Sequence, residues 1–83
     1  MAALEAGTMF DEILDLLAST ATPELIIEFR PSERLQLRLR DLLDRNRNDL
    51  LTAEERIELD EFSRMNHFMS MLKIRARKRL AAL

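Results

Sequence analysis

The longest segment without a helix-breaking residue constrains the fold most. From Ala53 to Ala81 the chain contains neither Gly nor Pro, and Thr52 with Glu55 three positions on forms the capping-box pattern that begins helices. The segment predicts one helix over residues 53–81, about 43 Å long at 1.5 Å per residue. Apolar residues in it recur at alternating steps of three and four, the spacing of a helix packed along one seam. These residues are Phe62, Met65, Met69, Leu72 and Ala76.

Shorter helices are predicted before this segment. Apolar residues at helical spacing follow Thr8, a residue type that caps helices, and predict a helix over residues 9–19. Thr22 and Pro23 begin one or two further turns, because Pro suits the first position of a helix. A third helix over residues 33–46 ends in an Asn- and Asp-rich loop, since these residues tolerate the left-handed conformation that stops helices.

Composition indicates the fold class and the kind of protein. Leu, Arg, Glu and Ala dominate and Gly occurs once, which favours an all-α fold: two short N-terminal helices followed by a helical hairpin with a long C-terminal helix. The 83 residues suit a single small domain over residues 1–83, with residues 1–7 expected as a disordered leader. We expect neither a membrane span nor a secretory signal, so the predicted location is cytoplasmic.

The size of the chain predicts a partner. A single core in a chain this small supplies only about 3–5 kcal/mol of net stability. We expect the short helices to cover the long helix over residues 55–70, so that its second half projects or pairs with another protein or a second copy. The expected anchors on this helix are Phe68, Met69, Met71, Leu72 and Ile74. For the clustered methionines of this helix, packing in the protein's own core is the first interpretation, because thioether side chains fill irregular gaps, and a partner surface is the alternative.

Charge is unevenly distributed along the chain. Residues 1–29 hold six acids and no Lys or Arg, whereas five bases lie within residues 73–79. The basic run suits a solvated helix end, which favours the C-terminal dipole, but also an acidic protein partner or the phosphates of a nucleic acid. Aromatic residues for base stacking do not interleave with these bases. The bases are Lys73, Arg75, Arg77, Lys78 and Arg79.

One loop resembles a calcium site. The stretch from Asp44 to Glu55 reads D-R-N-R-N-D-L-L-T-A-E-E and is similar to an EF-hand loop between two helices. The resemblance implies metal ligands at Asp44, Asn46, Asn48 and Glu55, although Asp49 stands where the EF-hand has Gly. A plain helical hairpin, with an Asn-rich loop that stops one helix and a capping box that starts the next, uses the same residues.

Catalytic constellations are not evident. His67 is the only His, no Cys is present, and the serines have no base beside them in sequence. Glu58 and Glu61 lack the Glu-x-x-His pattern of a di-metal centre. We therefore expect a protein that is not an enzyme and carries no cofactor.

The chain from Thr22 to Arg77, about two thirds of its length, resembles a bacterial family. The resemblance rests on T-P-E-L-I-I-E-F-R-P-S-E-R-L-Q, on L-L-D-R-N-R-N-D-L-L-T-A-E-E-R-I-E-L-D-E-F and on N-H-F-M-S-M-L-K-I-R-A-R. The family consists of small helical proteins of cyanobacterial type, often encoded beside a small HNH-type nuclease in an arrangement like a toxin–antitoxin pair. The resemblance implies a non-catalytic, antitoxin-like or accessory partner of a nuclease, whose acidic segment 5–28 would cover a basic cleft.

Overall fold

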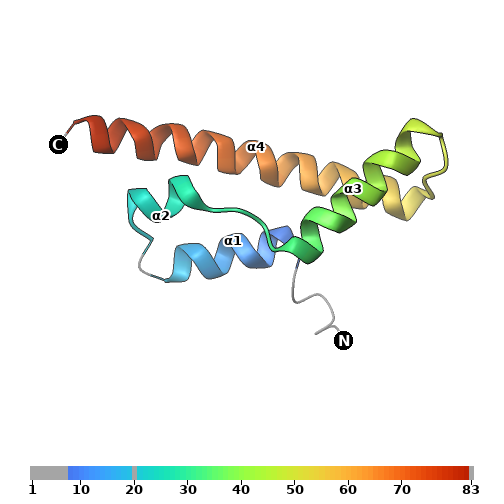
Figure 1. Cartoon of the computed structure of the whole chain (residues 1–83), viewed down its shortest axis with the longest axis horizontal. Coiled ribbons are helices and arrows are strands. Elements are labelled where there is room, and N and C mark those ends of the chain that lie inside the picture. The colour runs from blue at the N-terminus through green and yellow to red at the C-terminus, as the bar shows by residue number, and fades with distance from the viewer. Residues whose placement is uncertain (1–7, 20, 83) are drawn as a thin grey trace.

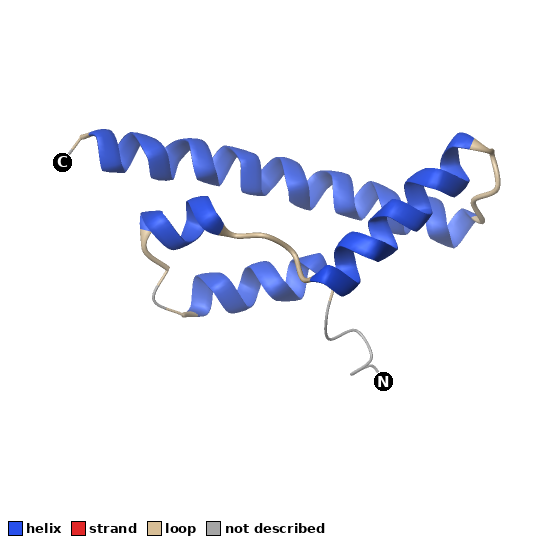
Figure 2. Ribbon diagram, viewed as in Figure 1, coloured by secondary structure: helices blue, strands red, loops and turns tan. Residues whose placement is uncertain are grey.

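The computed structural model describes residues 8–19 and 21–82, which form four helices and no strand (Figures 1 and 2). The all-α prediction is confirmed, and the predicted helix over residues 53–81 is α4. The predicted leader, residues 1–7, lies outside the described residues. The helices are α1 (Met9–Ala18), α2 (Pro23–Glu28), α3 (Glu33–Arg47) and α4 (Ala53–Ala81).

Each described helix begins at a hydroxyl residue that satisfies a backbone donor of its first turn. Thr8 and Thr52 form full capping boxes, in which the hydroxyl accepts the N–H three residues on and the carboxylate there accepts the cap's own N–H. Thr22 and Ser32 accept the N–H of Leu25 and Leu35 in the same way. Because these hydrogen bonds are local, the first residue of each helix could be predicted from the sequence.

The turn between α3 and α4 uses a left-handed residue. Asn48 caps α3, and Asp49 has a φ of 58°, a region that Asp visits more readily than most residues. The N–H of Leu50 then donates to the carbonyl of Arg45 at 2.8 Å, which satisfies an acceptor at the helix end. The chain therefore reverses within a few residues, and α4 begins directly after Thr52.

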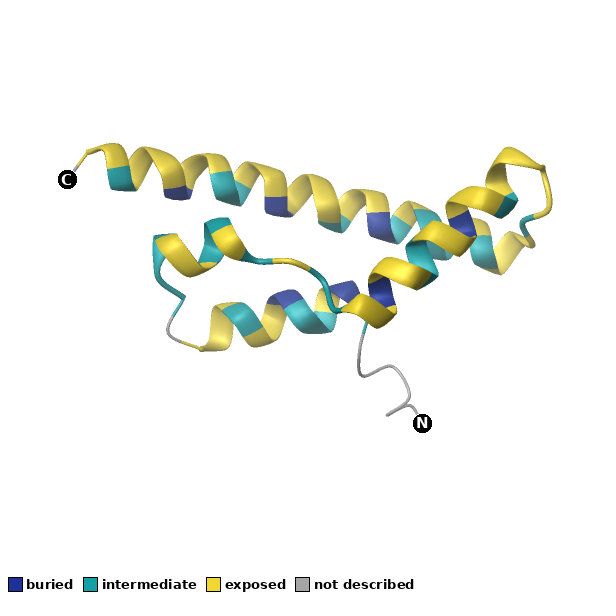
Figure 3. Ribbon diagram, in the orientation of Figure 1, coloured by how far each residue is buried: buried dark blue, intermediate teal, exposed yellow. Residues whose placement is uncertain are grey.

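The core is small and lies where α1, α3 and α4 meet. Its buried side chains come from all three helices: Met9 and Ile13, Leu35 and Leu42, and Phe62 and Met69. Figure 3 shows buried positions recurring at intervals along α1, α3 and α4, with exposed positions over most of the remaining ribbon. Leu42 is fully buried, so α3 contributes the most enclosed side chain of the core.

The position of α2 differs from the expectation. The short helices were expected over residues 55–70 of α4, but α2 lies beside the second half of α4 (Figure 1). Ala76 is buried there, and the Lys73 ammonium donates a hydrogen bond to the carbonyl of Phe29 at 2.9 Å. The extended residues around Pro31 separate α2 from α3, so that α2 can pack further along α4. The second half of α4 is thus partly covered.

The molecule is thin. Its principal extents are 48 × 30 × 18 Å, and a helix with its side chains is about 10–12 Å across. The shortest extent is therefore less than the width of two helices packed with their side chains, and each described helix has sides that no other described helix covers. Among the described helices, none combines the length and the apolar character that crossing a lipid bilayer requires.

Candidate protein-interaction surface

The outer side of α4 carries exposed apolar side chains. Phe68, Met71 and Ile74 are 45%, 41% and 49% exposed. They lie three residues apart, so consecutive members are neighbours on the helix surface. Three of the five anchors predicted from the sequence are therefore accessible.

The other two predicted anchors face the core. Met69 is 3% exposed and belongs to the core cluster, and Leu72 is half-buried against that cluster. Met69 follows Phe62 by seven residues, which places both on the same side of α4. The assignment of Met69 to a partner surface is therefore corrected: Met69 fills the core, which is the first interpretation of the clustered methionines.

A second exposed apolar surface lies on α1 and was not predicted. Phe10, Leu14 and Leu17 are 48%, 46% and 41% exposed, and their i, i+4, i+7 spacing places them on one side of the helix, here called the α1 flank. The sequence carried a signal for it, because apolar residues in α1 occur in adjacent pairs. Such pairs give α1 a wide apolar side, and contact with the core covers only part of it. Met9 and Ile13 are the two buried residues of α1.

The basic run does not form one surface. Lys73 is held against α2 by its hydrogen bond to Phe29, whereas Arg75, Arg77, Lys78 and Arg79 are exposed and make no ion pair within the described residues. Consecutive positions on a helix are 100° apart, so these four side chains spread around the end of α4. Of the five bases predicted as a nucleic-acid surface, Lys73 is therefore bound within the protein, and the other four are accessible.

The EF-hand-like loop does not bring its predicted ligands together. Asp44 and Asn46 are still helical and point to different sides of α3, and Asp44 pairs with Arg47 at 2.5 Å. The Asn48 amide donates to the carbonyl of Asp44 at 2.9 Å. Glu55 accepts from the backbone N–H of Thr52 at 3.0 Å and from Arg45. This geometry agrees with the plain helical hairpin, in which an Asn-rich loop ends α3 and a capping box begins α4.

Candidate metal ligands are not grouped elsewhere in the described residues. Over 8–19 and 21–82, no group of three or more His, Cys, Asp or Glu side chains is placed to hold a metal ion. His67 is exposed on α4.

Ion pairs connect α3 to the first turns of α4. The Arg38 guanidinium donates two hydrogen bonds to the Glu58 carboxylate, each at 2.9 Å, and Arg45 bridges Asp41 at 3.2 Å and Glu55. The hydrogen bond to Glu58 raises the pKa of Arg38, and the bond to Glu55 raises the pKa of Arg45. The Thr52 N–H first, and then the Arg45 guanidinium, lower the pKa of Glu55. Glu55 thus joins the helix cap to the ion pairs.

The lowered pKa of Glu55 predicts an acid-sensitive contribution to stability. A carboxyl with a lowered pKa in the folded state stabilises the fold above its ordinary value near 4.5, and this contribution is lost as the pH falls through the folded pKa. We expect Glu55→Gln to lower the free energy of unfolding at pH 7, and the gap to the original protein to shrink towards pH 3. Urea unfolding at both pH values measures this gap. Glu54→Gln, in the same helical turn, is the control for loss of one carboxylate, and an equal gap at both pH values would contradict the expectation.

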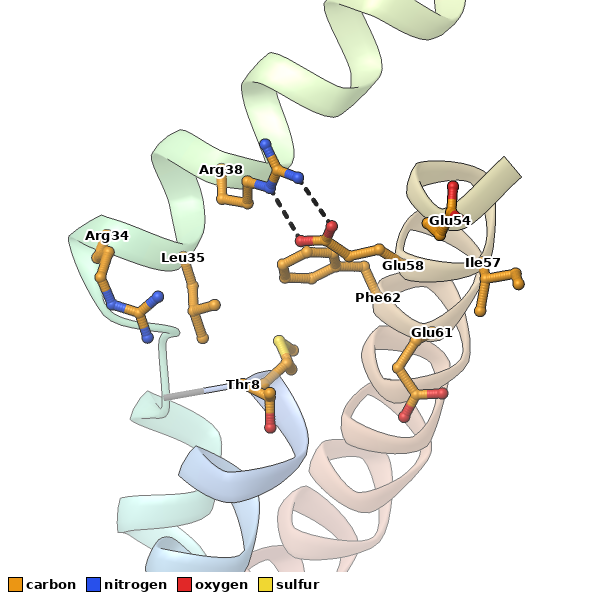
Figure 4. A pocket seen from close by; sticks show the side chains of 10 residues that line it. Thr8, Arg34, Leu35, Arg38, Glu54, Ile57, Glu58, Glu61 and Phe62 are labelled. Atoms are coloured by element: carbon orange, nitrogen blue, oxygen red, sulfur yellow. Dashed lines mark hydrogen bonds and ion pairs between the residues drawn. The ribbon is translucent and has the colours of Figure 1, made fainter. Parts of the chain in front are cut away.

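A pocket of about 540 Å³ opens between the start of α1, α3 and the first half of α4 (Figure 4). Met9, Leu35 and Phe62 give it an apolar floor, and the Arg38–Glu58 pair lies across one side. Charged side chains of both signs form its rim, from α3 and from α4: Arg34, Glu54 and Glu61. This lining suits an apolar side chain of a partner with polar groups beside it.

Comparisons with known proteins give no further assignment. No protein-family model, no curated protein and no solved structure matches the chain.

Proposed function

We propose that this protein is a non-catalytic interaction module, an antitoxin-like or accessory partner of a nuclease. The observation that carries the proposal is the α1 flank, Phe10, Leu14 and Leu17, which remains exposed on an acidic part of the chain. Leu25 of α2 adds a further side chain that is 46% exposed. Apolar side chains at helical spacing are the anchors with which one protein recognises another.

Charge supports a basic partner. Asp15 on α1 and Glu24 and Glu28 on α2 are exposed and make no ion pair within the described residues. A nuclease binds a polyanion, and its substrate cleft is therefore positively charged. Acidic groups around an apolar anchor complement such a cleft and compete with nucleic acid for it. The resemblance of residues 22–77 to proteins encoded beside HNH-type nucleases agrees with this kind of partner.

The test compares two variants of the tagged chain in the cells from which it comes. Leu14→Arg with Leu17→Arg places two positive charges on the α1 flank, at positions where the folded chain has room for long side chains. We expect the original chain to retain a basic nuclease at equal stoichiometry and to inhibit its cleavage of nucleic acid. The double variant is expected to lose both binding and inhibition, because the apolar contact is gone and the charges repel.

Leu37→Arg is the matched control. Leu37 is also a leucine in a helix and is 52% exposed, but it lies on α3. We expect this variant to keep the nuclease bound and inhibited. Retention of the same partner by the α1 variant, or capture of a protein without nuclease activity, would overturn the proposal. Equal far-UV circular dichroism of the three chains shows that all of them are folded.

A further inference from the structure

The second half of α4 presents apolar and basic side chains together on its outer side. Phe68, Met71 and Ile74 are exposed there, at intervals of three residues. Arg75 follows Met71 by four positions and Lys78 follows Ile74 by four, so each base lies beside an apolar residue on the helix surface. Both bases are exposed and are in no ion pair in the part of the chain that the structure describes. We call this set the basic row: Phe68, Met71, Ile74, Arg75 and Lys78.

The α1 flank is the acidic counterpart of the basic row. Residues 8–29 contain five acids and no Lys or Arg, whereas residues 62–82 contain six Lys or Arg and no acid. In the described residues, none of those five carboxylates is in an ion pair. Asp11 lies three positions before Leu14 and therefore beside it, and Asp15 is exposed one turn further on. Asp11 accepts hydrogen bonds only from Thr8, which carries no charge.

The α1 flank and the basic row of one chain are not in contact, because both remain exposed in the folded chain. Met71 is about 200° around the helix from the buried Met69, so the row points away from the core in which α1 packs. A nucleic acid would pair with the two bases but would leave Met71 and Ile74 without apolar contacts. The α1 flank of another copy supplies apolar side chains and carboxylates together.

We propose that the α1 flank of one copy packs on the basic row of a second copy. Two-fold symmetry makes this contact twice, because each copy's flank covers the other's row, and assembly therefore closes at a dimer. Because the α1 flank is also the surface of the proposed function, it cannot hold a second copy and a nuclease at once. Nuclease binding then separates the dimer, a step that rests on the proposed function.

Light scattering of the purified full chain tests the dimer. We expect a mass of twice 9.7 kDa. Phe68→Glu with Met71→Glu places acids opposite the acidic flank and is expected to halve this mass, with unchanged far-UV circular dichroism. Leu37→Glu, on α3, is the control and stays dimeric. A single-chain mass for the original protein at every concentration, or a dimer that survives the double variant, would overturn the proposal.

Chemical cross-linking identifies which surfaces meet. The chain has no Cys, so Leu14→Cys in a tagged chain and Met71→Cys in an untagged chain place one thiol at the centre of each surface. With a flexible bismaleimide, an equal mixture is expected to give a linked pair that contains one chain of each kind. Leu37→Cys in place of Leu14→Cys is the control and is expected to give little product. Met71→Cys chains that link to one another as readily as to Leu14→Cys would show that two rows face each other, which would overturn the proposal.

Nuclease binding separates this proposal from the proposed function. The Phe68→Glu, Met71→Glu chain is expected to be a single chain and yet to bind and inhibit the nuclease, because its α1 flank is intact. Leu14→Arg with Leu17→Arg is expected to lose both contacts. An original chain that does not dimerise but binds the nuclease overturns only the self-association. One that dimerises but binds no nuclease overturns only the proposed function. A nuclease complex that retains the dimer would overturn the shared use of the α1 flank.

Discussion

Replacement of Leu42 by Ala is expected to unfold much of the protein at 25 °C. Leu42 is the most enclosed side chain of the core, with no exposed surface. Such a truncation costs about 2–5 kcal/mol, because it removes buried methyl groups and leaves a cavity. A core of this size supplies only about 3–5 kcal/mol in total. Urea unfolding followed by circular dichroism measures the loss, with the free energy of unfolding compared between the two chains.

Leu43→Ala is the control for that experiment. Leu43 is the next residue of the same helix, and its side chain is 43% exposed. We expect its replacement to change the free energy of unfolding by about 0.5 kcal/mol or less. Equal losses for the two variants would show that α3 is turned about its axis relative to the described structure.

The second large effect is expected at Met69. Replacement of Met69 by Lys places an unpaired charge in the core, where Met69 is 3% exposed, and costs roughly 3–5 kcal/mol. Replacement of Met71 by Lys leaves the charge in solvent, since that side chain is 41% exposed. We expect Met69→Lys to be largely unfolded and Met71→Lys to keep the helicity of the original chain. Far-UV circular dichroism of the two variants and the original chain measures this.

A folded Met69→Lys variant would contradict the assignment of Met69 to the core. It would return this residue to the partner surface on which the sequence placed it. A loss of helicity in Met71→Lys alone would show that the outer and inner sides of α4 are exchanged.

Much of the secondary structure could be predicted because its causes are local. Thr8, Thr22, Ser32 and Thr52 each cap a helix by a hydrogen bond to a residue three positions on, so a few neighbouring letters are sufficient. The long α4 follows in the same way from the absence of Gly and Pro between its caps.

The candidate surfaces could be predicted only in part. Phe68, Met71 and Ile74 were expected to be accessible and are exposed, but Met69 between them is buried. Local patterns also contain no reason to place α2 beside the second half of α4, because the contact between Phe29 and Lys73 joins residues 44 positions apart and depends on the path of the chain around Pro31. The exposed side of α1 is likewise decided by packing between helices that are distant in the sequence.

The sequence by itself determined the helices, their ends and the change of charge along α4, because caps, breakers and side-chain charge act over one or two turns. Only the tertiary structure decided which side of each helix is covered. Met69 and Met71 are the same residue type two positions apart, and packing in the core buries Met69 and leaves Met71 exposed. Their difference comes from contacts between distant parts of the chain, which local patterns do not contain.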